Sequence, residues 1–324
     1  MLVLRIHSCF LAAAMCVTGH VVIAADYPER SIHVVVPTTA GGGADTIART
    51  LAARLTERLG WSVFVENRPG ANGVIGVDQV AKAAPDGHTL LLTFADHFVN
   101  PSLYKALPFD MAGDFAPVNF LGALPFVLVV TPSLPAQSVQ SLIELARARP
   151  GKLNFASVGT GGMVHMAAEL FKLGAGVAMT HVPYKGSSAA LPDVINDRVQ
   201  LMFTSAISAK PFVDSGRLRM LGISSPERSP TLPDLPTVAE SGVPGYQVEI
   251  WYGVLAPART PSAVIARLNA EIGSVIGAND FKATLARQGV VVAPPGTPEQ
   301  FRAFYTAEMS KWARVVRETR IEVN

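Results

Sequence analysis

Apolar residues occur along this chain in two alternating patterns: short continuous runs, and longer segments with a single apolar face. The run at residues 31–36 predicts a strand, and the segment from Ala44 onward predicts a helix. The apolar residues of this helix recur at helical spacing: Ile47, Ala48, Leu51, Leu55 and Leu59. Strands at 61–67 and 88–94, with a helix at 74–84 between them, complete a β-α-β-α-β order that is typical of a parallel sheet.

The same order recurs in the second part of the chain. Helices are predicted at 138–151, 159–176 and 187–199, and strands at 153–159, 179–186, 199–205 and 218–225. Ser138 is the residue type expected to cap the first of these helices. No period of 20–50 residues repeats, so a solenoid is not predicted.

Two long extended runs, at 116–131 and 246–257, separate the two parts. We therefore predict an α/β fold of two lobes joined by two extended hinge crossings, of the type found in periplasmic binding proteins. Residues 26–125 and 251–324 would form the first lobe, including the C-terminal helices, and 126–250 the second. Such a hinge encloses a cleft, and ligand sites favour domain interfaces and the carboxyl ends of sheet strands.

The first 25 residues resemble a secretory signal peptide. Arg5 provides a positive start, residues 9–17 form a short apolar stretch, and small residues precede a cleavage site near Ala24 or Ala25. A membrane anchor is the alternative, but a spanning helix needs about 20 apolar residues. A lipoprotein anchored through Cys16 is a weaker alternative, because Met15 is a poor residue before a lipidated cysteine.

Charge and cysteine content narrow the class of protein further. The formal net charge of +2 predicts no nucleic-acid partner and no binding to an anionic membrane surface. Both cysteines, Cys9 and Cys16, lie in the expected signal segment. The mature chain would then have no disulfide, no thiolate nucleophile and no cysteine-ligated metal. We expect a soluble periplasmic monomer without cofactor or metal.

The stretch "VVVPTTAGGGAD" joins a strand to a helix through a glycine-rich turn, and three kinds of ligand could occupy such a turn. A nucleotide phosphate is not favoured, because the third glycine of the dinucleotide fingerprint is replaced by Thr46 and the Gly-Lys-Ser/Thr of a P-loop is absent. An enzyme's oxyanion and the carboxylate of a small solute are the other two candidates.

The sequence offers little support for an enzyme. Five histidines follow the signal segment: His33, His88, His97, His165 and His181. None lies in a recognisable metal-binding spacing, and the chain has no G-x-S-x-G nucleophile motif. Ser157 and His165 could be taken for a nucleophile and a base, but we interpret them as a strand end and a structural helix residue. We predict no catalytic residues.

A carboxylate fits the turn on physical grounds. A helix N-terminus presents unpaired backbone N–H groups and about half a positive charge, and glycine lets an anion approach the backbone. Similar turns start helices at 157–165 and 184–191, in the second lobe, and the turns should face each other across the cleft. We interpret Asp45 as a helix cap and Lys185 as a surface lysine, although either could reach the ligand.

Taken together, these blocks resemble the Bug proteins, the periplasmic solute receptors of tripartite tricarboxylate transporters. The resemblance covers nearly the whole mature chain. It rests on the "VPxxxGGGxD" turn followed by Ala48 and Arg49, on "ENRPGANGVIG", "AAPDGHTLLL", "FASVGTGGMVHMAAELF" and "HVPYKGSSAALPDVINDRV", and on "WYGVLAPARTP". The order and spacing of the blocks are more specific than any single block.

The resemblance implies a two-lobed receptor that holds a small carboxylate largely through backbone N–H groups and waters. It implies a first turn at 38–43, a second turn at 157–162 and walls formed by the strand ends near residues 94–96 and 204–205. The ligand-binding residues that we predict on this basis are Thr38, Thr39, Ala40, Gly41, Gly42, Gly43, Asp45, Ala95, Asp96, Ser157, Gly159, Thr160, Gly161, His165, Lys185, Thr204 and Ser205.

The chain departs from the family pattern at several positions. Thr38, Thr39 and Ala40 replace an aromatic residue and prolines, and Gly162 stands where a serine is common. Thr204 replaces a frequent aspartate, which favours a plain organic acid over an amino acid as ligand. Membrane transporter subunits are the expected partner. A sensor protein served by an orphan receptor, and an enzyme on the same scaffold, are the alternatives.

Overall fold

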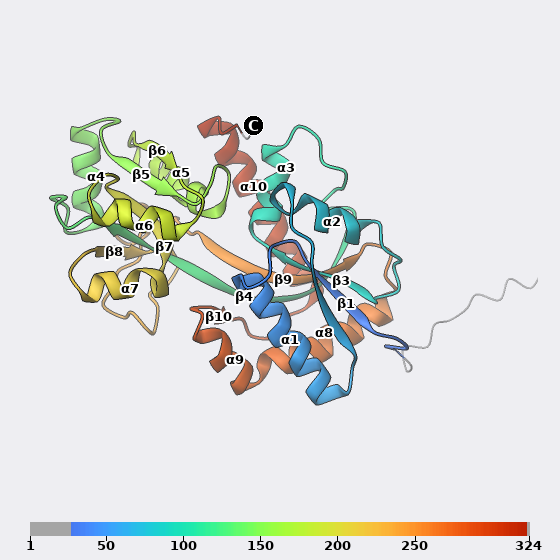
Figure 1. The fold of residues 1–324 in the computed structure, drawn as a ribbon. Helices are drawn as coiled ribbons and strands as arrows, with labels where there is room; N and C mark the ends of the chain where they lie inside the picture. The colour runs from blue at the N-terminus through green and yellow to red at the C-terminus, as the bar shows by residue number, and fades with distance from the viewer. Residues whose placement is uncertain (1–26, 323–324) are drawn as a thin grey trace, which may run out of the picture.

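The computed structural model describes residues 27–322, so the expected signal segment lies outside the described residues. Figure 1 shows two α/β parts side by side, connected by the strands β4 (Phe115–Val130) and β9 (Glu249–Pro257). The first half of β4 pairs antiparallel with β9, and its second half pairs antiparallel with β7 of the other part. The two extended crossings predicted from the sequence are confirmed, and β4 belongs to both parts.

The first part is built on a sheet with the strand order β2-β1-β3-β9-β4, to which the short β10 adds along β4. Its strands besides β4 and β9 are β1 (Ile32–Val36), β2 (Val63–Asn67), β3 (Thr89–Phe94) and β10 (Val291–Val292). Its helices are α1 (Gly43–Leu59), η2 (Ala71–Gly73), α2 (Val74–Ala81), α3 (Asp96–Leu103), α8 (Ser262–Gly277), α9 (Asn279–Ala286) and α10 (Pro298–Thr319). The pairs β1–β2 and β1–β3 are parallel, as the β-α-β-α-β order predicts.

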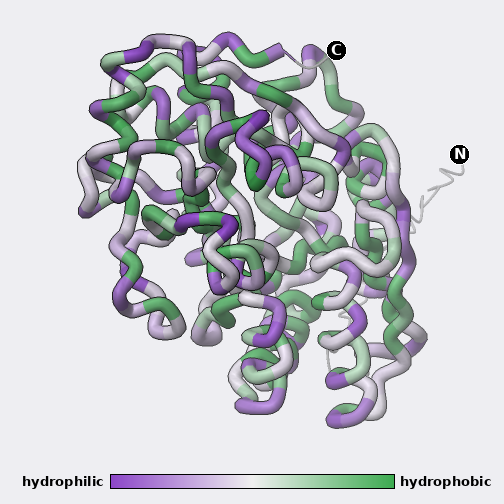
Figure 2. The backbone as a smooth tube through the Cα atoms, turned by 60° about the vertical axis from the view of Figure 1, so that its left-hand side comes forward, coloured by the Kyte–Doolittle hydropathy of each residue, from purple (hydrophilic) through white to green (hydrophobic). Residues whose placement is uncertain are grey.

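Alternating residues of β1 pack on opposite faces of this sheet. Val34 and Val36 are buried in a cluster with α1, α8 and α9, whereas Val35 is buried in a second cluster with α2, α3 and α10. The strand therefore reads as a continuous apolar run, because both of its faces are covered. Figure 2 shows hydrophobic stretches within the body of both parts and hydrophilic stretches in the outer turns.

The second part repeats this plan, with the strand order β4-β7-β5-β6 and with β8 on the other edge of β4. Its strands are β5 (Asn154–Ser157), β6 (Thr180–Pro183), β7 (Leu201–Ser205) and β8 (Arg219–Ile223). Its helices are α4 (Val139–Ala148), α5 (Met163–Ala175), α6 (Ser187–Ile195) and α7 (Ala206–Asp214). The pairs β5–β6 and β5–β7 are parallel, and Ser138 caps α4 in a capping box with Ser141.

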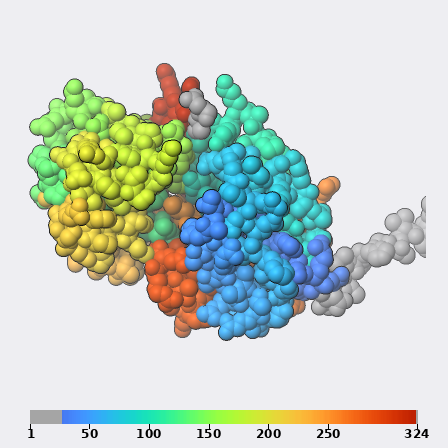
Figure 3. Space-filling model, viewed as in Figure 1, coloured from blue at the N-terminus to red at the C-terminus, as the bar shows by residue number. Residues whose placement is uncertain are grey.

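One apolar core runs from the second part into the first. The same buried cluster contains Phe171 and Phe203 of the second part together with Phe98, Trp251 and Tyr305 of the first. Helix α10 packs against both α3 and α5, and so connects the two parts. Figure 3 shows that the surface is hollowed between the green-yellow part and the blue part.

Two helices of the structure are not predicted by the sequence pattern. Helices α3 and α7 have eight and nine residues, and each contains a proline, Pro101 and Pro211 respectively. Proline normally interrupts a helix, and so short a segment has too few turns to reveal an apolar face. Each helix follows a strand almost directly, and Ser205 caps α7 by accepting a hydrogen bond from the amide of Ser208.

Replacing Gly253 with alanine should destabilise the fold. A Cβ atom at this position of β9 would overlap the buried ring of Phe301 and lie 3.0 Å from the carbonyl oxygen of Asn119. Overpacking of this kind costs about 1–3 kcal/mol in the free energy of unfolding, which urea denaturation measures. Gly277→Ala is the matched control, since its Cβ would meet Pro295 at 3.6 Å, an ordinary contact. Equal stability of the two variants would contradict this packing.

Candidate functional site

The two glycine turns predicted from the sequence have the same backbone conformation. Gly41 and Gly161 lie in the left-handed region, with φ of +84° and +81°. The next residues, Gly42 and Gly162, are extended, with φ of −79° and −73°, and are the N-cap residues of α1 and α5. Positive φ is readily adopted only by glycine, which explains why both turns carry one at this position.

In each turn the left-handed glycine is held by the side chain four residues further along. The amide of Gly41 donates to Oδ2 of Asp45 at 2.8 Å, and the amide of Gly161 donates to Nδ1 of His165 at 3.0 Å. Asp45 thus fixes the turn, and the N-cap position that it was expected to fill belongs to Gly42.

This bracing leaves amides of the first helical turn available. Among residues 27–322, the N–H groups of Gly43 and Ala44 in α1, and of Val164 in α5, have no hydrogen-bond acceptor. They carry the positive end of the helix dipole. Both turns are therefore suited to hold an anion through the backbone.

The buried carboxylate beneath the first turn is neutralised locally. Asp45 is 3 % exposed, lies 3.0 Å from Nε of Arg49 and accepts a hydrogen bond from Nδ2 of Asn67 at 2.9 Å. Burial alone would raise the pKa of Asp45, but the hydrogen bonds from Arg49, Gly41 and Asn67 outweigh it and hold the pKa below its usual value. The guanidinium of Arg49 is thereby committed to this network.

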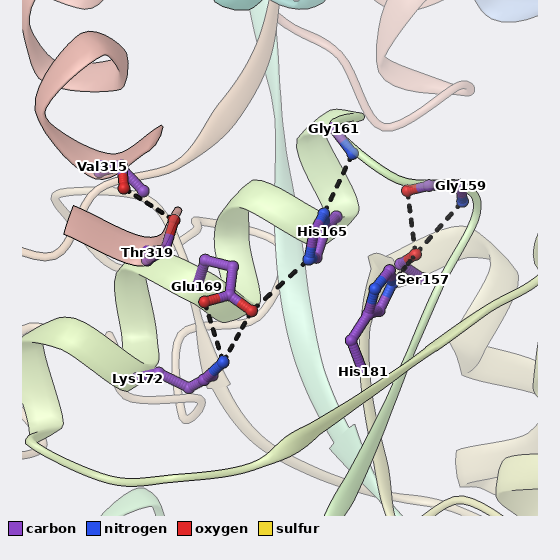
Figure 4. Close-up of polar contacts among 9 residues, drawn as sticks. All are labelled: Ser157, Gly159, Gly161, His165, Glu169, Lys172, His181, Val315 and Thr319. Carbon is purple, nitrogen blue, oxygen red and sulfur yellow. Dashed lines mark hydrogen bonds and ion pairs between the residues drawn. The ribbon is translucent and has the colours of Figure 1, made fainter. Parts of the chain in front are cut away.

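A pair of stacked imidazoles supports the second turn (Figure 4). The rings of His165 and His181 lie 3.8 Å apart between centroids and 10° from parallel. Because Nδ1 of His165 accepts the Gly161 amide, its proton lies on Nε2, which faces Oε1 of Glu169 at 3.5 Å. Glu169 in turn pairs with Lys172 at 2.8 Å. Burial would raise the pKa of Glu169, but the contacts with His165 and Lys172 hold it below its usual value.

Ser157 forms its short contact with His181 rather than with His165. Its hydroxyl lies 2.6 Å from Nε2 of His181 and also bonds to the backbone of Gly159, so both histidines fix the second turn. Ser157 has no exposed surface, whereas His181 is half-buried. The sequence does not reveal the role of His181, because its partner lies 24 residues away on a neighbouring strand.

Asp96 contacts the second turn, and Tyr252 lies beside the first. Oδ1 of Asp96, the first residue of α3, accepts a hydrogen bond from the amide of Met163 in α5 at 3.2 Å. A Cβ atom on Gly43 would lie 3.3 Å from the hydroxyl of Tyr252 in β9. Burial and the nearby charge of Asp96 both raise the pKa of Tyr252. Tyr252 is a site residue that the sequence analysis does not identify.

The other predicted residues lie in different surroundings. Thr39, Ala40 and Thr160 are exposed in the turns, as is Lys185 before α6. Thr38 is half-buried, and its hydroxyl has no hydrogen-bond partner among the described residues. Ala95 and Ser205 form contacts within the fold. Ala95 is buried and its amide donates to the carbonyl of Trp251, and the Ser205 hydroxyl caps α7. Thr204 is buried in β7, with 2 % of its surface exposed.

No group of three or more His, Cys, Asp or Glu side chains is arranged to hold a metal ion in residues 27–322. In the same range, none of the helices has the length and apolar character needed to cross a bilayer.

The two α/β parts, joined by extended strands and each carrying a glycine turn between a strand and a helix, define the class of periplasmic solute-binding proteins. Residues 47–321 match the family model described as tripartite tricarboxylate transporter family receptor, and the chain belongs to this family. The family consists of receptors, not enzymes.

Relatives and solved structures agree with this assignment. The chain is 40% identical to Protein BugT of Bordetella pertussis over 297 residues, which cover 90% of each protein. Two similar solved structures are R. palustris Rpa4515 with adipate, at 37% identity and a TM-score of 0.78, and MatC of Rhodopseudomonas palustris with bound malate, at 32% and 0.74. These cover 92% and 90% of this chain, and 99% and 100% of the neighbours.

The histidine beneath the second turn should remain neutral well below pH 6. Burial, and next the adjacent His165, lower the pKa of His181 to about 4. An unfolded histidine has a pKa of about 6.5 and takes up a proton first, so the stability that His181 contributes is present above pH 6.5 and is lost as pH falls toward 4. An NMR titration of the His181 ring, assigned with His181→Phe, measures this.

The matching stability experiment compares wild type with His181→Phe in urea. Between pH 6.5 and 4.5, the wild type should lose more free energy of unfolding than the variant, because only the wild type excludes this proton. A His181 midpoint near 6.5, with equal losses in both proteins, would contradict the buried neutral pair.

Proposed function

We propose that this protein captures a small organic acid, a dicarboxylate or tricarboxylate, between its two glycine turns and delivers it to the membrane subunits of a tripartite tricarboxylate transporter. The observation that supports this proposal most directly is the equivalence of the two turns. Each has a left-handed glycine, a side-chain brace four residues on and unpartnered helix amides.

Two separate amide sites suit a ligand with an acidic group at each end. The two ligand-bound neighbours hold adipate and malate, and both ligands are dicarboxylates. Charge-assisted hydrogen bonds are each worth about 1.5–3 kcal/mol, so two to four of them approach the roughly 8 kcal/mol of micromolar binding. The site needs no arginine of its own, and Arg49 is already paired with Asp45.

We further propose that the two parts act as lobes that close on the ligand. The lobes would comprise 26–125 with 251–324, and 126–250. The change of pairing partner within β4, from β9 to β7 at Phe126, supports a boundary near residue 125. The ligand-binding residues proposed from the sequence would then line the closing faces, together with Tyr252.

Gly42→Val should abolish binding while leaving the fold intact. At this extended position a Cβ would meet only the carbonyl oxygen of Thr39 at 3.7 Å, so the fold tolerates it. The branched side chain would, however, occupy the space in front of the Gly43 and Ala44 amides. Calorimetric titration with adipate and with malate should show at least an approximately tenfold weaker Kd, the equivalent of about one lost hydrogen bond.

Gly277→Val is the matched control, because this position at the end of α8 has comparable room and lies away from both turns. Wild-type affinity in Gly42→Val would place the site elsewhere. If neither acid binds to the wild type, native mass spectrometry of the freshly purified protein can identify a co-purified ligand. A co-purified organic acid would support the proposal, and a non-acidic ligand would overturn it.

A further inference from the structure

We propose that the Asp96 carboxylate is a built-in competitor of the ligand: it holds the Met163 amide of the second turn in the empty protein, and an incoming acid must displace it. This inference rests on the proposed function, because it concerns the same pair of turns. It gives Asp96 a role opposite to that of a residue that binds the ligand directly.

The position of the carboxylate is that of an anion at a helix N-terminus. Oδ1 of Asp96 lies 3.2 Å from the Met163 amide nitrogen, and a Cβ on Gly162 would lie 3.5 Å from the same oxygen. A side chain at Gly162 would therefore be in contact with the carboxylate. The amide is one of the orphan donors of α5, at the positive end of its dipole.

This contact also joins the two parts of the molecule. Asp96 follows β3 directly and is positioned by the first part, whereas Met163 belongs to the second part. The hydrogen bond therefore connects one part to the other and resembles the bridge that a ligand carboxylate would form. Breaking it therefore removes one restraint on the separation of the parts.

The surroundings of Asp96 provide no compensating positive charge. Within residues 27–322, Asp96 forms no ion pair. Tyr252 of β9 and the buried His97 of the same helix are neutral at pH 7, because burial raises the pKa of Tyr252 and lowers that of His97 to about 3. Burial raises the pKa of Asp96 to about 6, although the Met163 amide acts in the opposite direction.

The two turns consequently differ in readiness for an anion. The first turn faces the uncharged hydroxyl of Tyr252, and its Gly43 amide has no acceptor within the described residues. The second turn has one amide occupied and a negative charge beside it at neutral pH. A dicarboxylate should therefore engage the first turn at once and reach the Met163 amide of the second turn only by expelling Asp96.

Titration of wild type, Asp96→Ala and Asp96→Asn with adipate at pH 7.5 tests the competition. Asp96→Ala should bind about tenfold more tightly than wild type, because both the competing acceptor and the like charge are removed. Asp96→Asn should gain less, since its amide oxygen can still accept the Met163 N–H. Asp234→Ala, an exposed change of the same charge, should bind as wild type does. An unchanged or weaker affinity of Asp96→Ala overturns the inference.

A second measurement requires no ligand. With Cys9 and Cys16 replaced by serine, spin labels at Ala53→Cys of α1 and Ala189→Cys of α6 report the distance between the two parts, since both alanines are exposed. In the empty protein, Asp96→Ala should give a longer or broader distance distribution than wild type. This measurement also applies if adipate binds to neither protein. A longer or broader distance in Asp96→Ala then supports the inference, even though adipate is not the ligand. An unchanged distance distribution overturns the inference.

Discussion

The site depends on one hydrogen bond in each turn, from a left-handed glycine amide to a side chain four residues on. Gly41 bonds to Asp45, and Gly161 bonds to His165. An amide that is withdrawn from water needs an acceptor, and each brace supplies one: the Gly161 bond is buried and the Gly41 bond is partly buried. The amides of Gly43, Ala44 and Val164 that follow remain without an acceptor among residues 27–322. A carboxylate in the first turn and an imidazole in the second both accept the glycine amide, because each is carried by the residue four positions further along.

The packing around these braces keeps buried charge paired. Asp45 is surrounded by Arg49 and Asn67, and Glu169 by Lys172 and His165, so neither carboxylate is buried alone. Breaking a buried pair leaves an uncompensated charge and costs several kcal/mol. The surroundings of Asp96 are different, because backbone amides, among them that of Met163, stabilise its charged form and no cationic side chain pairs with it among residues 27–322. This contrast separates charges that maintain the fold from a charge placed where a ligand could replace it.

The connection between the two parts limits how the turns can approach each other. Strand β4 is hydrogen-bonded to β9 in one part and to β7 in the other, so its backbone cannot slide without breaking one of the two ladders. Helix α10 packs on both α3 of the first part and α5 of the second. The apolar core that includes Trp251 continues from one part into the other. Movement of the parts is therefore most easily accommodated as rotation about β4 and β9 that keeps this core packed.

The sequence by itself determined the repeated strand-turn-helix plan, the crossings and the glycine turns, because these depend on apolar periodicity and on the conformational freedom of residues such as Gly41. It also located the Ser138 cap, a short-range signal. It missed α3 and α7, whose prolines hide a short helical pattern. Only the tertiary structure decided that Ser157 meets His181, and that Asp96 reaches Met163, 67 residues away in the chain. Such pairings arise from strand order and from the placement of one part against the other, which no local pattern encodes.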